Sequence, residues 1–168
     1  MPKVLLINPP FEQEEESVGR SKSVRKVLNI IPPLGITYIA AILERAGIEV
    51  KIIDCAVGIS FDDLFKMILG EHPDVIGITS TTPAFVNARK IASFVREKRP
   101  EVKILIGGAH VSALPDETMK TDLFDIGVIG EGEKTIEHLF KNFKNREFVG
   151  LDGIRGICYK NKEEMCKN

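Results

Sequence analysis

Cysteine is scarce in this sequence, charge of one sign does not predominate, and long apolar runs are missing. The three cysteines, Cys55, Cys158 and Cys166, are a scattered set with no C-x-x-C pair and no metal-ligand spacing to a histidine. This usage favours a reducing cytoplasm over a disulfide framework, and we expect no metal site on this chain. The net charge of −1 gives no footprint for nucleic acid. No apolar run approaches the roughly 20 residues of a membrane span, and no signal peptide precedes the first strand, so we expect a cytoplasmic protein without a membrane partner.

The sequence has enough apolar material for one hydrophobic core. Its composition, 43% hydrophobic and 28% charged, is typical of a globular protein. Its 168 residues are enough for one α/β domain and too few for two. We expect that domain to span residues 1–147. Amphipathic stretches predict helices, with Pro33, Ser60 and Pro83 near their starts. Short apolar runs predict strands at residues 3–8, 49–54, 74–79, 102–106 and 125–129.

The apolar runs are continuous rather than alternating. Parallel strands that are buried on both faces have this pattern. The sequence therefore predicts a flavodoxin-like (Rossmann-like), doubly wound α/β fold with a five-stranded parallel sheet in the order 2-1-3-4-5. Residues 148–168 have strand character again, with turn glycines at Gly150, Gly153 and Gly156. We expect this tail to begin a linker or hairpin toward a further C-terminal domain.

Small and hydroxylated residues follow several of the predicted strands. Ligands of such sheets bind outside the carboxyl ends of the strands, where the strand order reverses. Two glycines in series after the fourth strand let a flat group approach the backbone, although a turn also uses glycine for its dihedral angles alone. The predicted crevice is lined by Asn8, Pro9, Ser80, Thr81, Thr82, Gly107, Gly108 and Ala109.

The segment after the fifth strand, GVIGEGEKT, approaches a nucleotide-binding motif without matching one. A phosphate-binding P-loop needs lysine directly after its last glycine, and Glu133 stands there instead. Glu133 is typical of a first helical turn, whereas Glu131 is available to accept hydrogen bonds from a loop or a ligand. We therefore add Gly130, Glu131 and Gly132 to the candidate binding residues.

Four segments carry a family resemblance in their order and spacing. PPLGITYIAAILERAG, DVIGITSTTP, ILIGGAHVS and DIGVIGEGE resemble the N-terminal cobalamin (vitamin B12)-binding domain of class B radical S-adenosylmethionine (SAM) enzymes, over about residues 3 to 145. These enzymes include methyltransferases and the magnesium-protoporphyrin ester cyclase group. The resemblance implies base-off cobalamin, whose nucleotide tail lies in a slot lined by Ser80, Thr81, Thr82, Gly107 and Gly108. A bulky side chain at Gly108 would then occupy the path of the tail.

Two departures from that family limit what this chain does alone. The cobalt-binding histidine of the methionine synthase branch has no counterpart after the first strand, and Ala56 stands after the second. His110 follows another strand and is interpreted as a hydrogen-bonding or exposed residue. The radical SAM motif C-x-x-x-C-x-x-C is missing, so we do not expect this chain alone to be catalytic. The [4Fe-4S] cluster and S-adenosylmethionine are expected in a C-terminal radical SAM domain in cis, in a parent methyltransferase or Fe–S oxidoreductase.

Two other interpretations stay open. The domain could have lost cobalamin and serve as an interaction or gating module of a radical SAM protein. It could also bind a different small molecule or nucleotide in the same crevice. The charged segment from Pro9 to Ile31 is interpreted either as a solvated loop without a role or as a segment that closes over a cofactor or partner domain, and we expect the latter.

Overall fold

Five parallel strands form the centre of the molecule in the predicted order. The computed structural model describes residues 2–10, 32–161 and 164–168, so the predicted closing segment lies outside the described residues from position 11 onward. The order β2-β1-β3-β4-β5 confirms the doubly wound, flavodoxin-like prediction. These strands are β1 (Lys3–Asn8), β2 (Glu49–Asp54), β3 (Val75–Thr79), β4 (Lys103–Gly107) and β5 (Ile126–Val128).

Two antiparallel strands from the tail extend this sheet to seven strands. β8 (Ile157–Asn161) pairs with β5, and β9 (Glu164–Lys167) pairs with β8. The β5–β8 pairing requires Gly127, because a Cβ there would lie 2.5 Å from Sγ of Cys158. A separate short ribbon joins β6 (Phe143–Lys144) to β7 (Glu147–Phe148). The tail therefore continues the sheet of the domain.

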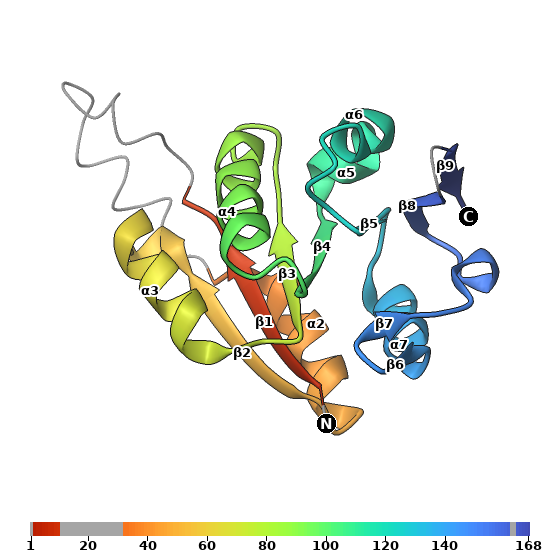
Figure 1. Cartoon of the computed structure of the whole chain (residues 1–168), viewed down its shortest axis with the longest axis horizontal. Coiled ribbons are helices and arrows are strands. Elements are labelled where there is room, and N and C mark those ends of the chain that lie inside the picture. Colours follow the sequence, from red (N-terminus) through yellow and green to blue (C-terminus); the bar gives the residue numbers. More distant parts are fainter. Residues whose placement is uncertain (1, 11–31, 162–163) are drawn as a thin grey trace.

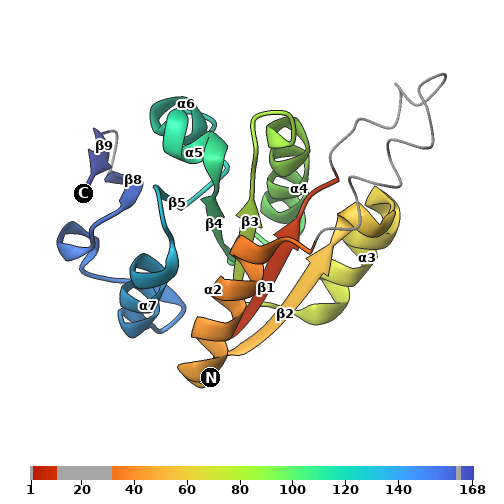
Figure 2. The ribbon, with the colours of Figure 1, turned by 180° about the vertical axis from the view of Figure 1, so that it is seen from behind.

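Helices cover both faces of the sheet (Figures 1 and 2). Ser60 caps its helix as predicted, accepting a hydrogen bond from the Asp63 amide at 3.2 Å. Pro33 lies one residue before its helix, and Pro83 lies in the turn two residues before its own. The helices are α2 (Leu34–Arg45), α3 (Phe61–Glu71), α4 (Phe85–Lys98), α5 (Ala109–Ala113), α6 (Pro115–Met119) and α7 (Glu133–Lys141).

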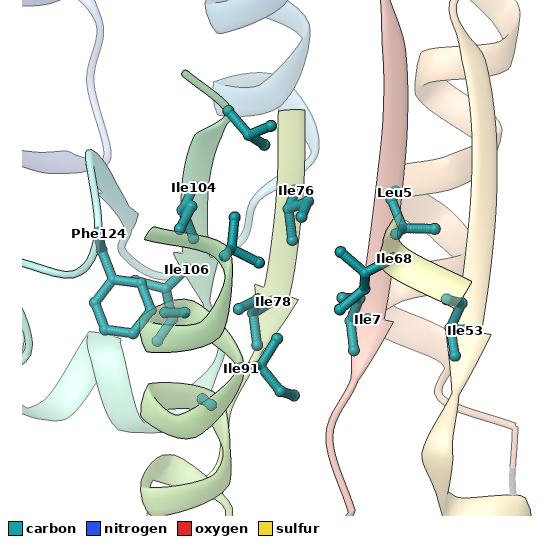
Figure 3. Close-up of a cluster of buried hydrophobic side chains, with 14 of the residues drawn as sticks. Leu5, Ile7, Ile53, Ile68, Ile76, Ile78, Ile91, Ile104, Ile106 and Phe124 are labelled. Atoms are coloured by element: carbon teal, nitrogen blue, oxygen red, sulfur yellow. The ribbon is translucent and has the colours of Figure 1, made fainter. Parts of the chain in front are cut away.

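The central strands contribute side chains to two hydrophobic cores, one on each face of the sheet, because successive side chains point to opposite faces. In β1, Leu5 and Ile7 join the core beneath α3 and α4, whereas Val4 and Leu6 join the core beneath α2 and α7. Figure 3 shows the first of these cores, where aliphatic side chains from four strands meet α3 and α4. Burial on both faces explains why the apolar runs of the sequence do not alternate.

His110 belongs to the α4 side of the sheet and is only 4% exposed. Its ring stacks on Phe85 with centroids 3.9 Å apart, and its Nδ1 lies 3.3 Å from Oγ1 of Thr82. Its Nε2 is buried without a hydrogen-bond partner among the described residues. Burial lowers the pKa of His110 below the ordinary value of 6.5, against a smaller opposing effect of Glu117. The residue is thus hydrogen-bonded, as expected, and it is buried in a helix, where burial disfavours its charged form.

We predict that His110 makes folding pH-dependent in a defined window. The unfolded chain protonates this imidazole near pH 6.5 and the folded chain only at lower pH, so the unfolded state binds more protons between these values. The free energy of unfolding should therefore fall as the pH drops from 7.5 to about 5.5. Chemical denaturation across this range should show a shallower dependence for His110→Phe. An unchanged slope in His110→Phe would contradict the assignment.

Candidate functional site

An apolar cleft of about 180 Å³ opens at the carboxyl edge of the sheet and runs between the sheet and helices α2 and α7. The loops after β4 and β5 form its mouth, together with Thr79 at the end of β3. Below the mouth, aliphatic side chains of the sheet form the floor, and helix residues form the walls. The floor comprises Val4, Leu6, Leu105 and Val128, and the walls include Ile36, Ile39, Leu43, Ile136 and Phe140.

Glycines leave space in the cleft. A Cβ placed on Gly35, in the first turn of α2, would meet no atom within 4 Å. A Cβ on Gly107 would make only an ordinary contact, 3.6 Å from Cβ of Val128. Gly77 in the floor is different, because a Cβ there would lie 2.7 Å from Cδ2 of Leu6, which already fills that position. The missing side chains of Gly35 and Gly107 thus leave space in the cleft, as does Gly130 at the mouth, where a Cβ would also meet no atom within 4 Å.

Gly108, the second glycine of the predicted pair, is required by the fold itself. Its φ of +104° lies in the region that side chains rarely adopt. A Cβ there would also lie 2.7 Å from the backbone oxygen of Ser80. The backbone dihedral angles therefore explain why position 108 is a glycine. For Gly107, the close approach of a ligand remains an explanation of the missing side chain.

Hydrogen bonds hold the loops of the mouth in place. The amide of Ser80 donates to the Gly107 carbonyl at 2.8 Å, and the amide of His110 donates to the Ser80 carbonyl at 3.1 Å. Ser112 joins the next two loops, since its Oγ donates to the Gly108 carbonyl at 3.1 Å and accepts from the Gly130 amide at 2.9 Å. Three consecutive strand ends are therefore fixed relative to one another before any ligand binds.

The structure separates the predicted residues into two groups. Those that line the cleft are Gly107, Gly108, Gly130, Glu131 and Gly132. The others follow the same strand ends outside the cleft lining; they are Asn8, Pro9, Ser80, Thr81, Thr82 and Ala109.

Some polar side chains at this edge are already used by the protein. Asn8 donates from Nδ2 to Oδ1 of Asp54 at 2.8 Å, and the Ser80 hydroxyl donates to the Thr81 carbonyl at 2.9 Å. Ser80 is also only 1% exposed. Thr81, Thr82 and Ala109 are exposed at the rim. The rim therefore offers few side-chain groups of its own, and a ligand there would meet mostly backbone and small residues.

Sequence reasoning missed Thr79 and the helical wall of the cleft. Thr79 lies on the same face of β3 as Gly77, whereas Ser80 is buried beyond the end of the strand. The alternation of β3 could have identified Thr79. The amphipathic stretch that forms α2 also lines the cleft, through Gly35, Ile36 and Ile39.

A second hollow, of about 450 Å³, lies at the far ends of α2 and α7. It contains none of the predicted residues, and the ion pair between Glu137 and Lys141 (2.7 Å) borders it. Among residues 2–10, 32–161 and 164–168, no group of three histidine, cysteine or acidic side chains could hold a metal ion. No helix in these ranges is long and apolar enough to cross a membrane.

The chain is similar in sequence to a longer protein. The chain is 36% identical over 162 residues to an uncharacterized methyltransferase, PH0819, of Pyrococcus horikoshii, covering 94% of this chain and 32% of that protein. It thus spans about a third of the relative.

Solved structures share the fold. The radical SAM methyltransferase TsrM from Kitasatospora setae, with tryptophan and a SAM analogue bound, superposes with a TM-score of 0.78 at 20% identity, over 99% of this chain and 30% of that one. The cobalamin-dependent SAM radical enzyme OxsB, with aqua-cobalamin and S-adenosylmethionine bound, gives 0.74 at 22% identity, over 100% and 22%.

The sequence model of the B12 binding domain family matches residues 21–140, which include α2, the strand ends of the mouth and most of α7. The predicted family is thereby confirmed, and its cofactor is chemically compatible with an apolar cleft beside a rim of small residues. The chain belongs to the B12 binding domain family.

Proposed function

We propose that this chain binds cobalamin in the base-off form, with the nucleotide tail in the cleft and the corrin ring over the carboxyl edge of the sheet. The observation that carries the proposal is a preformed apolar cleft in a B12-binding domain, open at this edge where Gly35 and Gly107 lack side chains. A flat base enters such a slot without displacing protein atoms, and its apolar surface leaves water.

The rim residues suit a large neutral cofactor. Asn8, Pro9, Ala109 and the segment 80–82 would lie beneath the corrin, while Gly107, Gly108 and the segment 130–132 would lie beside the tail. Glu131 is exposed at the mouth and can accept hydrogen bonds from the amide groups of a corrinoid. Bound cobalamin supplies a cobalt centre that can carry a methyl group, and the protein supplies its position and surroundings.

The positions of the three histidines support a site in which none of them binds the cobalt. His110 is buried against Phe85 on the opposite side of the sheet from the cleft, and His72 and His138 lie on the exposed ends of helices. We therefore propose that cobalt receives no nitrogen from the protein.

The parent protein would add the chemistry that this chain lacks. The chain spans about a third of its relative, so a radical SAM domain in cis, holding the [4Fe-4S] cluster and S-adenosylmethionine, would face the corrin. Exposed apolar residues near the carboxyl edge, Leu34, Val57 and Val86, suit a surface that another domain covers. The proposed role is that of a cofactor carrier in methyl transfer or related radical chemistry.

Filling the cleft should abolish binding without unfolding the chain. Gly35→Phe places a ring in open space at the mouth, and we expect the dissociation constant for hydroxocobalamin to rise roughly tenfold or more as the base loses its buried contact. Gly70→Phe is a matched control, because Gly70 is also helical with nothing within 4 Å and lies outside the cleft. Equilibrium dialysis with corrin absorbance measures both variants. If Gly35→Phe binds as tightly as Gly70→Phe, the tail does not use this cleft.

Retention of a corrin by the wild-type chain decides between the interpretations left open by the sequence. After incubation with hydroxocobalamin and desalting, we expect a corrin spectrum from the folded protein. A folded chain that retains none would instead be an interaction module or a binder of another small molecule.

The axial coordination has its own spectroscopic test. Cob(II)alamin bound to this chain should show an electron paramagnetic resonance spectrum without nitrogen superhyperfine splitting, because neither the base nor a histidine reaches cobalt. Free cob(II)alamin at neutral pH, with its base coordinated, provides the reference with three-line splitting. A three-line pattern in the protein complex would contradict the proposed coordination.

A further inference from the structure

The geometry points to selection among cobamides by the chemistry of their lower base: the cleft should favour an apolar benzimidazole over the more polar adenine. This inference rests on the proposed function, because it concerns the same cleft. It goes further by assigning the ligand class that the cleft distinguishes.

Strand register orders the cleft into layers. Thr79 pairs with Gly107 at the mouth, and Leu6, Gly77 and Leu105 form the next layer down the floor. Val4, which pairs with Val75, lies one layer deeper, so the floor is aliphatic below its first layer. The walls at these depths are the aliphatic and aromatic side chains of α2 and α7.

Polar side chains occur only at the mouth among the residues that line the cleft. These are Thr79, at the end of β3, Glu131, in the loop after β5, and Glu133, at the start of α7. The main chain does not compensate deeper down, because floor residues of β1, β3 and β4 lie in paired parallel ladders. A polar group carried below the mouth would therefore lose water and find no replacement partner.

Adenine and dimethylbenzimidazole are both flat bicyclic bases, so shape alone separates them weakly. Adenine carries an exocyclic amine and additional ring nitrogens, where dimethylbenzimidazole carries two methyl groups. Burial of unpaired polar groups is unfavourable, and burial of the methyl groups is favourable. Hydrophobic pockets reject polar isosteres only moderately, so we expect the adenine cobamide to bind roughly 10- to 100-fold more weakly.

The experiment compares three corrinoids on this chain by equilibrium dialysis: hydroxocobalamin, the cobamide with adenine as its base, and cobinamide, which has no base. We expect cobalamin to bind most tightly and both other corrinoids to bind more weakly. Adenine is the less basic ligand and leaves cobalt more easily. Release of the base from cobalt therefore costs less free energy for the adenine cobamide, which favours its binding. This difference cannot cause the weaker binding that we expect.

A polar group introduced into the wall should reduce the discrimination. Ile39→Gln places an amide in the cleft, where it can pair with adenine, and we expect the ratio of the two dissociation constants to fall severalfold. Ile42→Gln is the matched control on the same helix, since Ile42 is also half-buried but lies outside the cleft. That variant should keep the wild-type ratio.

The outcomes separate the two proposals. Equal affinity for cobalamin and the adenine cobamide, with cobinamide weaker, would overturn the selection and leave the proposed function standing. Cobinamide binding as tightly as cobalamin would contradict the placement of the base in the cleft, and it would overturn both the selection and that part of the proposed function. Failure of all three corrinoids to bind would overturn the proposed function and the selection with it.

Discussion

The missing side chains of Gly35 and Gly107 are the constraint on which the site depends. Helices α2 and α7 pack against the sheet through aliphatic residues, and such layers ordinarily close until no space remains. Here the first turn of α2 and the end of β4 contribute no side chain, so the layers stay apart at the carboxyl edge. The cleft lining forgoes packing contacts that a bound apolar group can restore.

The two faces of one sheet therefore serve different purposes. On the α3 and α4 side, Leu5, Ile91 and Ile104 belong to a filled core, and even His110 is stacked and buried there. On the α2 and α7 side, the same strands end in an open cleft. The filled core stabilises the strand ends, and the hydrogen bonds of Ser112 fix the loops around the mouth. A rigid rim reduces the ordering that binding would otherwise require.

The sequence predicted the order of the parallel sheet, because continuous apolar runs report burial on both faces. It did not predict that β8 and β9 would extend the sheet, since that pairing depends on Gly127 leaving room for Cys158. The sequence also could not distinguish Gly107 from Gly108, because a positive φ and a nearby carbonyl are visible only in three dimensions. The wall formed by α2 was missed for a related reason: residues such as Ile39 have the same spacing in a core as beside a cleft.

The central claim is that the base of bound cobalamin lies against the floor of the cleft. Hydroxocobalamin contains diamagnetic cobalt(III), so nuclear Overhauser effects can be measured in its complex with this chain. The account predicts effects between the methyl protons of the base and the methyl groups of Leu6 and Leu105, which face the cleft. A bound corrin whose base methyl protons show no effect to either leucine would contradict it.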